Sequence, residues 1–411
     1  MIIFASYKLN ESKRRYKSFV PYAPDERRKQ LEELASLYVS EGLKSKCSAL
    51  KQILNTESSR DQALITRKFF PKKTISARVD KIQHYHGDTI IETNKPNEIV
   101  RALQLENKDK YSCTNETLLM QSTTHTKLGN FAETTYAKAL LKGTSPIPGS
   151  YSKWSKAMIS KAKYLTSIPK LSTSMTPEEV KATWRATKEN KASPLSGRYN
   201  AVYKALCMRP HTLETLTNAM NLPFITGHPY DRWKNMLDIM VFKTKSSMMV
   251  NSLRSIIIAE ADWNASGRTH ITKRMMAHAE RLHLLPNEHI GGRKGKKSIE
   301  GAITKRLIME NARLLRRPIV VISTDAANCY DRVVYKYVST VCNKWGVSTP
   351  VMKALLEPLQ QARHYTRTAY GDSDSFFTGS NLQGAGQGNT SAAPYWTCVS
   401  TSMIEVLTEN G

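Results

Sequence analysis

The stretch PIVVISTDAANCYD (residues 318–331) carries the strongest signal in the sequence. Four consecutive Ile and Val residues follow Pro318, which is typical of a strand buried on both faces. Asp325 would end that strand, where a rigid backbone fixes the position of its carboxylate. A strand that ends in Asp is a common pattern, and Asp325 would serve equally well as the N-cap of a helix. Taken alone, the stretch predicts a rigidly placed carboxylate of either a structural or a functional kind.

A second signal is the loop LQGAGQGNTSAAP (residues 382–394), which has three glycines within five residues. Glycines placed just before a helix let the backbone approach a flat or charged ligand closely, although ordinary turns use the same residues. Helices are predicted between the two signals over residues 333–345 and 351–364, followed by a hairpin over 367–379. Upstream of residue 318, strands are predicted over 237–242 and 252–260 and helices over 268–285 and 298–315.

The net charge of the chain indicates what kind of partner it binds. Lys and Arg number 61 against 35 Asp and Glu, a formal charge of +26. Such an excess favours a polyanionic partner, with nucleic acid first and an acidic membrane surface second. A solvated basic surface without a partner is the alternative.

Six scattered cysteines form no C-x-x-C pair, which favours reduced thiols over disulfides or a zinc site. The pair His84 and His86 fits a surface strand better than a metal site. No stretch is long and apolar enough to span a membrane, and the N-terminus lacks the order of a secretory signal. We therefore expect an intracellular protein of the nucleus or cytoplasm, neither secreted nor membrane-bound.

The coarse organisation is α+β. Residues 1–145 read as a mainly helical connector with an apolar face in 26–54, a short strand near DTIIET (88–93) and a helix beginning near Pro96. The turn-rich segment GTSPIPG (143–149) separates this region from residues 146–411.

Five segments in the second region resemble the reverse transcriptases of non-LTR-type retroelements. STDAANCYDRV (323–333) is similar to motif A, which is D-x-x-x-x-(F/Y)-D after a palm strand, and LQGAGQGNTSAAP is similar to motif B. HIGGRKGKKSIEGAI (289–303), VFKTKSSMMVNSLRSIII (241–258) and KASPLSGRYNAVYKAL (191–206) resemble the family's fingers segments in the same order. The resemblance implies an incomplete right-hand polymerase architecture of fingers and partial palm over residues 146–411.

The same resemblance implies roles around motif A. Asp325 would bind two catalytic Mg²⁺ ions, or Mn²⁺, with the Ala326 carbonyl as a backbone ligand. Two such ions would clamp the attacking and leaving oxygens of nucleotidyl transfer. Tyr330 would be the steric gate against a ribose 2′-OH. Asp331 matches a frequent family residue, although a carboxylate at a helix N-terminus explains it equally well.

Roles are also implied outside motif A, for an RNA template, a DNA primer and an incoming dNTP. Gln387 and Gly388 would shape the nucleotide pocket, while Lys243 and Arg254 would meet the triphosphate or template backbone. Residues 291–317 contain nine Lys or Arg against two Glu. Within that block the loop cluster is the better candidate for phosphate contacts, and a solvated helix face accounts for the rest. The cluster consists of Arg293, Lys294, Lys296 and Lys297.

One part of the family pattern has no counterpart in this sequence. The family's third motif is an Asp-Asp hairpin after motif B, and no Asp-Asp pair occurs in the 411 residues. The segment YGDSD (370–374) precedes motif B and reads as a plain hairpin. Without that motif and a thumb, we expect the chain as given to extend primers little or not at all. The alternative function is a non-catalytic nucleic-acid-binding remnant of a retroelement.

Overall fold

The architecture comes from a computed structural model, which describes most residues between 79 and 410. The described residues are 32–37, 39–42, 48, 52, 79–112, 127–151, 153–161, 168–189, 191–192, 194–243, 248–326, 328–377 and 383–410. The chain divides into two compact units, residues 1–76 and 77–411, so the predicted boundary at 145/146 falls inside the second unit. In the first unit residues 32–37 are helical, within the predicted helix over 26–54, most of which lies outside the described residues.

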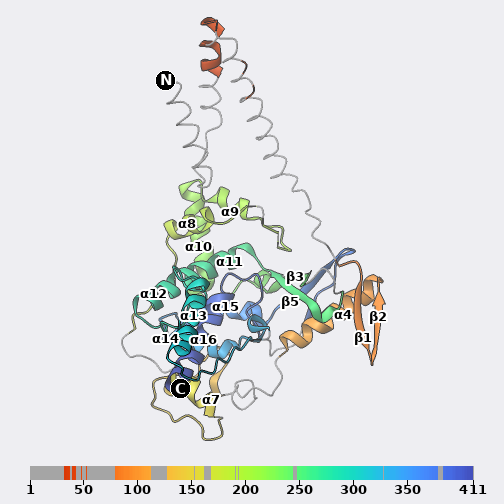
Figure 1. Cartoon of the computed structure of the whole chain (residues 1–411). Coiled ribbons are helices and arrows are strands. Elements are labelled where there is room, and N and C mark those ends of the chain that lie inside the picture. Colours follow the sequence, from red (N-terminus) through yellow and green to blue (C-terminus); the bar gives the residue numbers. More distant parts are fainter. Residues whose placement is uncertain are drawn as a thin grey trace. The chain divides into compact units, whose positions relative to one another are not determined.

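The second unit is a mixed α+β structure built on a small sheet. Four strands follow the order β4 (Leu253–Ile258), β3 (Asn235–Phe242), β5 (Arg363–Thr368) and β6 (Gly371–Asp372), and β7 (Phe376–Phe377) also pairs with β5. β3 is antiparallel to β4 and parallel to β5. The strands predicted over 237–242 and 252–260 and the hairpin predicted over 367–379 are confirmed. In Figure 1 helices gather on one side of β3 and β5.

A separate hairpin and one long helix pack against the other part of this sheet (Figure 1). β1 (Ile82–His86) pairs with β2 (Thr89–Thr93), which confirms a strand at the two histidines. α4 (Pro96–Tyr111) begins at the predicted proline, which is tolerated in a first turn because its missing N–H would be unpaired there. A small core of apolar side chains joins these elements to β3 and the residues before β4.

Helices make up most of the second unit, and those predicted over 268–285, 298–315 and 333–345 are confirmed with shifted ends. The described helices are α6 (Thr135–Leu141), α7 (Lys153–Lys161), α8 (Pro177–Arg185), α9 (Asn200–Leu206), α10 (Pro210–Thr226), α11 (Ala261–Gly267), the π-helix η4 (Arg268–Met275), α12 (Met276–Arg281), α13 (Ser298–Leu314), α14 (Tyr335–Lys344), α15 (Thr349–Gln360) and α16 (Ala392–Asn410). Short 3₁₀ turns stand at η2 (Asp231–Lys234), η3 (Val250–Ser252) and η5 (Cys329–Arg332).

The main core lies where α8, α10, α11, α14, α15 and α16 meet. Its largest fully buried side chains are Trp184, Trp233, Trp263, Trp345 and Tyr395. The four cysteines that the structure describes are free thiols, and Cys47 and Cys113 lie outside the described residues. Two of the thiols, Cys342 on α14 and Cys398 on α16, have sulfurs 3.8 Å apart in this core.

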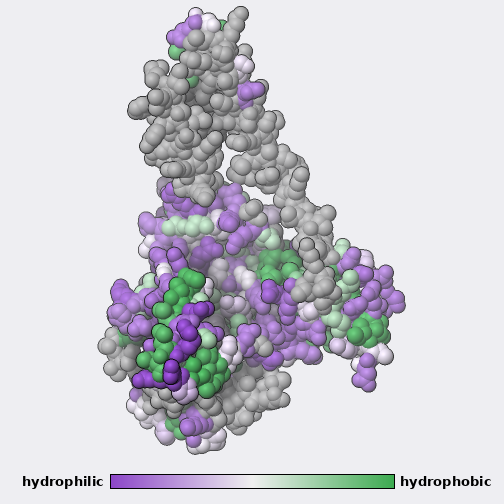
Figure 2. Space-filling model, viewed as in Figure 1, coloured by the Kyte–Doolittle hydropathy of each residue, from purple (hydrophilic) through white to green (hydrophobic). Residues whose placement is uncertain are grey.

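The strand predicted over residues 318–324 is wrong. This segment is extended but pairs with no described strand, and Val320 and Ile322 are 85% and 83% exposed. In the sheet β4 and β5 flank β3, β6 and β7 take the other side of β5, and on the outer edge of β4 Ile257 N–H donates to the Gln387 carbonyl. α13, just before it, also has no buried residue in the structure. Figure 2 shows hydrophobic beside hydrophilic surface over α13.

A second correction concerns the helix predicted over 351–364. The helix ends at Gln360, and Arg363 and His364 instead begin β5, which pairs with β3. The helical spacing of apolar residues continues to Leu359 and Ala362. The next residues pair with β3, and this pairing decides their structure because strand formation depends on tertiary context.

Candidate functional site

The structure brings the predicted motif A turn and the predicted motif B loop into direct backbone contact. Ala385 N–H donates to the Tyr330 carbonyl over 2.7 Å, and Gly384 N–H donates to the Val333 carbonyl over 2.9 Å. The Tyr335 hydroxyl, from α14, donates to the Gly384 carbonyl over 2.7 Å. Three hydrogen bonds therefore join segments some fifty residues apart in the chain.

Two glycines of the loop are required by the closeness of these contacts. Gly384 has φ +104°, and a Cβ there would stand 3.0 Å from the Asp331 carbonyl oxygen. Gly388 has φ +112°, and a Cβ there would stand 2.4 Å from the Ile257 carbonyl oxygen. Other residues rarely adopt such φ values, so a side chain at either position would both strain the backbone and collide with a neighbouring backbone.

The same loop lies along the outer edge of β4. Ile257 N–H donates to the Gln387 carbonyl over 2.7 Å, on the edge of β4 that does not pair with β3. Gln387 is half-buried and Gly388 is exposed. Asn389 closes the turn, since its side-chain oxygen accepts from Ser391 N–H over 2.9 Å at the start of α16.

The two predicted fingers cations lie together on the β3–β4 hairpin. Val241 is the partner of Arg254 in the ladder, and Lys243 follows two positions later, so both cations lie on one face of the hairpin. Both are exposed. The opposite face carries Phe242 and Leu253 into the small core with α4. Lys243 and Arg254 are thus held on a rigid element and point away from its core.

Asp331 is a buried carboxylate close enough to Lys243 to feel its charge. It is 4% exposed, and its Oδ1 has no hydrogen-bond partner among the described residues. Burial raises the pKa of Asp331 to about 6, although the positive charges of Lys110, Lys243 and Arg332 oppose part of that rise. The sequence is compatible with two roles for Asp331: a residue that the reverse-transcriptase family frequently has there, or a carboxylate at the N-terminus of a helix. The structure places it in a 3₁₀ turn against the loop backbone.

Asp325 and Ala326 lie in the exposed segment that precedes this turn. Asp325 is close enough to Cys329 that its charge, after burial and the charge of Asp331, helps to raise the pKa of that thiol. Asn328 makes the turn between them with φ +50° and accepts from Asp331 N–H over 2.8 Å. Tyr330, the predicted gate, is half-buried against the main core.

The donor set around Asp325 does not fit two magnesium ions. Mg²⁺ prefers octahedral oxygen ligands with carboxylates among them. Here the Asp325 carboxylate and the Ala326 carbonyl would be the ligands, while Asp331 is buried under the loop. Within the described part of the chain, no three His, Cys, Asp or Glu side chains form a cluster that could hold a metal ion. We therefore derive no chemical step through a metal.

The basic loop 293–297 divides into one structural cation and three exposed ones. Arg293 donates to both carboxylate oxygens of Glu280, over 2.8 and 2.6 Å, and to the Pro286 and His289 carbonyls. The pKa of Glu280 is lowered mainly by this pair. Arg293 therefore anchors the loop to α12. The exposed cations are Lys294, Lys296 and Lys297.

A buried polar cluster behind the site escaped the sequence analysis. Asp238 on β3 is fully buried, its two carboxylate oxygens lie 3.2 and 3.0 Å from His364 Nδ1, and Asn107 donates to it over 3.1 Å. Tyr111 stacks on the His364 ring at 5.3 Å. The available signal was an Asp within the otherwise apolar run LDIMVF, since a buried carboxylate needs partners.

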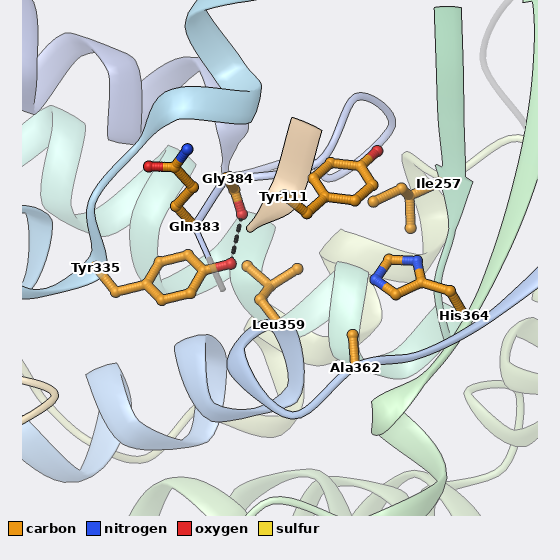
Figure 3. A pocket seen from close by; sticks show the side chains of 8 residues that line it. All are labelled: Tyr111, Ile257, Tyr335, Leu359, Ala362, His364, Gln383 and Gly384. Carbon is orange, nitrogen blue, oxygen red and sulfur yellow. Dashed lines mark hydrogen bonds between the residues drawn. The ribbon is translucent and has the colours of Figure 1, made fainter. Parts of the chain in front are cut away.

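Two of these residues, Tyr111 and His364, line a pocket that the loop residues Gln383 and Gly384 also border (Figure 3). Tyr111 comes from the end of α4, Leu359 from α15 and His364 from β5, and the two rings face the pocket beside the dashed Tyr335–Gly384 bond. The other lining residues are Ile257, Ala362 and Gln383. Of the polar groups that line the pocket, the Tyr335 hydroxyl holds the loop through the Gly384 carbonyl.

Comparison with known proteins adds no family. No protein-family model matches the chain, and no curated protein is significantly similar to it. No described helix is long and apolar enough to cross a membrane.

Proposed function

We propose that residues 146–411 form the fingers and part of the palm of a reverse-transcriptase-like polymerase, and that they bind a template and primer. The observation that carries the proposal is the backbone contact between the turn at 330–333, the loop at 383–388 and β4. Five residues predicted to contact the incoming nucleotide or, for the two cations, the triphosphate or template backbone come from these segments and from the β3–β4 hairpin. They are Tyr330, Gln387, Gly388, Lys243 and Arg254.

Lys243 and Arg254, on the exposed face of the β3–β4 hairpin, add positive charge beside the contact between the turn at 330–333, the loop at 383–388 and β4. Phosphate oxygens suit a guanidinium and an ammonium that a sheet holds in position. With a formal charge of +26, the whole chain also attracts nucleic acid electrostatically. Binding should therefore show little sequence preference and weaken steeply as salt rises.

The binding test uses a labelled RNA–DNA primer–template and the double variant Lys243→Gln/Arg254→Gln. We expect the slope of log Kd against log salt to flatten by about 1.5, since each phosphate contact contributes about 0.7–0.9. The matched control is Lys138→Gln/Lys142→Gln, which removes two exposed cations at the end of α6. Equal effects of the two variants, or salt-insensitive binding by the unmodified chain, would count against the proposal.

A non-catalytic nucleic-acid-binding protein is the second candidate, and the donor set at Asp325 favours it for this chain. We expect no primer extension by residues 1–411 with magnesium or manganese, because Asp325 is exposed whereas Asp331 is buried, and no three potential metal ligands cluster among the described residues. Robust extension that Asp325→Asn abolishes would overturn this second candidate and establish the catalytic one. Extension that survives Asp325→Asn would show that another carboxylate is responsible.

A further inference from the structure

Two cations on the π-helix η4 are held by hydroxyl groups and not by carboxylates. Arg268 Nη1 donates to Thr187 Oγ1 over 2.9 Å, and Lys273 Nζ donates to Thr183 Oγ1 over 3.0 Å. Thr183 lies in the last turn of α8 and Thr187 just beyond it. Isolated π-helical turns are frequent at functional sites. The end of α8 thus orients two cationic side chains without neutralising them.

Two further cations from the segment after α8 join this pair. Partial burial lowers the pKa of Lys191, and the positive charges of Arg268 and Lys188 lower it further. Burial lowers the pKa of Arg268, and burial and then the charge of Arg268 lower that of Lys273. Lys188, Lys191 and Lys273 are exposed and Arg268 is half-buried. We call these four residues the η4 cation cluster.

The nearby carboxylates are already committed to other cations. Glu179 accepts a bidentate pair from Arg274, although its charge still reaches Lys273 weakly. Glu189 Oε1 lies 3.5 Å from Lys204 Nζ. In the part of the chain that the structure describes, no member of the cluster forms an ion pair of its own. The carboxyl end of α8 offers about half a negative charge, against four positive ones. The cluster therefore holds positive charge that an external anion would neutralise.

Two members of the cluster, Arg268 and Lys273, lie on η4, which continues α11 and with it contacts the residue after the loop of the candidate site. Thr390 N–H donates to the Asn264 side chain over 3.1 Å, and Thr272 donates to the Thr390 carbonyl over 2.9 Å. Asn264 lies in α11 and Thr272 in η4. The helix that carries Arg268 and Lys273 is therefore fixed to the residue that follows the loop at 383–389.

We propose that the η4 cation cluster binds consecutive phosphates of a nucleic-acid strand. The inference rests on the proposed function and extends it to a second contact surface, on α8 and η4. Exposed ammonium groups on two segments suit a series of phosphodiesters, and the threonine hydroxyls keep Arg268 and Lys273 oriented before binding. A nucleoside triphosphate shares this chemistry, so the experiment separates the two sources.

The experiment measures binding of a labelled single-stranded RNA across a salt titration, with the unmodified chain and Arg268→Gln/Lys273→Gln. We expect the slope of log Kd against log salt to flatten by about 1.4, at about 0.7 per contact on a single strand. The matched control Lys138→Gln/Lys142→Gln should leave the slope nearly unchanged. A second variant, Lys188→Gln/Lys191→Gln, should flatten it similarly and leaves the threonine contacts intact if the first variant unfolds.

The outcomes separate the inference from the proposed function. If the unmodified chain binds no RNA, both fail. If it binds and the cluster variants match the α6 control, only the cluster is overturned while nucleic-acid binding stands. A free triphosphate without metal that displaces RNA from the unmodified chain, but not from the cluster variants, would identify a nucleotide site and overturn the strand proposal.

Discussion

Residues 253–258 and 318–324 are both short stretches rich in Ile and Val, and they take different structures. β4 pairs with β3 along its whole length, and its side chains alternate between core and surface. The segment 318–324 pairs with no described strand, and Val320 and Ile322 are almost fully exposed. The difference teaches that an apolar run becomes a strand only where a neighbouring edge supplies hydrogen bonds. On β4, even the outer edge is occupied, by the Gln387 carbonyl.

The largest expected effect comes from matched truncations in the two stretches. Ile257→Ala removes a side chain that is 5% exposed, and we expect a loss of about 2–5 kcal/mol in the free energy of unfolding. Ile322→Ala, at a side chain that is 83% exposed, should change it by about 0.5 kcal/mol or less. Urea denaturation measures both. Similar losses at the two positions would mean that 318–324 is packed in solution and would break the comparison.

The next effect concerns the carboxylate that adjoins the exposed stretch. Asp331 has a folded pKa of about 6 against an ordinary 3.8, a difference worth about 3 kcal/mol. Because the folded pKa is raised, the carboxyl costs no stability below pH 3.8, and stability falls as the pH rises through 6.

Asp331→Asn should therefore stabilise the protein at pH 8 by up to about 3 kcal/mol, and the gain should vanish towards pH 4. Urea denaturation of both proteins across this range measures the difference. Asp325→Asn, in the exposed segment, is the control and should alter stability by about 0.5 kcal/mol or less at pH 7. If Asp331→Asn raised the free energy of unfolding by the same amount from pH 4 to 8, the ionised Asp331 carboxylate would not be destabilised by burial.

The smallest expected change in stability concerns the loop that lies on the outer edge of β4. Gly388→Ala places a methyl group 2.4 Å from the Ile257 carbonyl oxygen at φ +112°, and should cost about 1–3 kcal/mol. Gly291→Ala is the control, since a methyl group there would have no atom within 4 Å and the φ of Gly291 is not positive. Thermal unfolding of both variants is the measurement. A neutral Gly388→Ala would mean that the loop does not lie on β4.

Much of the local structure could be predicted, because helices and strands leave a period in the sequence. The strands at 237–242 and 252–260 and the helix at Pro96 were predicted from alternation, length and start signals. The glycine loop is predicted to approach a ligand closely, and that stays a prediction; in the structure Gly384 and Gly388 lie against the protein's own backbone. The contact between Asp238 and His364 could not be predicted, because the local sequence around each residue gives no information about a partner far away in the chain.

The sequence by itself determined the α+β composition, the strong positive charge and the order of the segments that carry the candidate site. Only the tertiary structure decided that β3 pairs with β5 and that residues 318–324 pair with no described strand. It likewise decided that Arg293 pairs with Glu280 while Arg268 and Lys273 keep their charge without an ion pair in the described chain. The physical reason is that periodicity records which side chains are apolar, whereas strand pairing and charge neutralisation depend on partners that folding brings from distant positions.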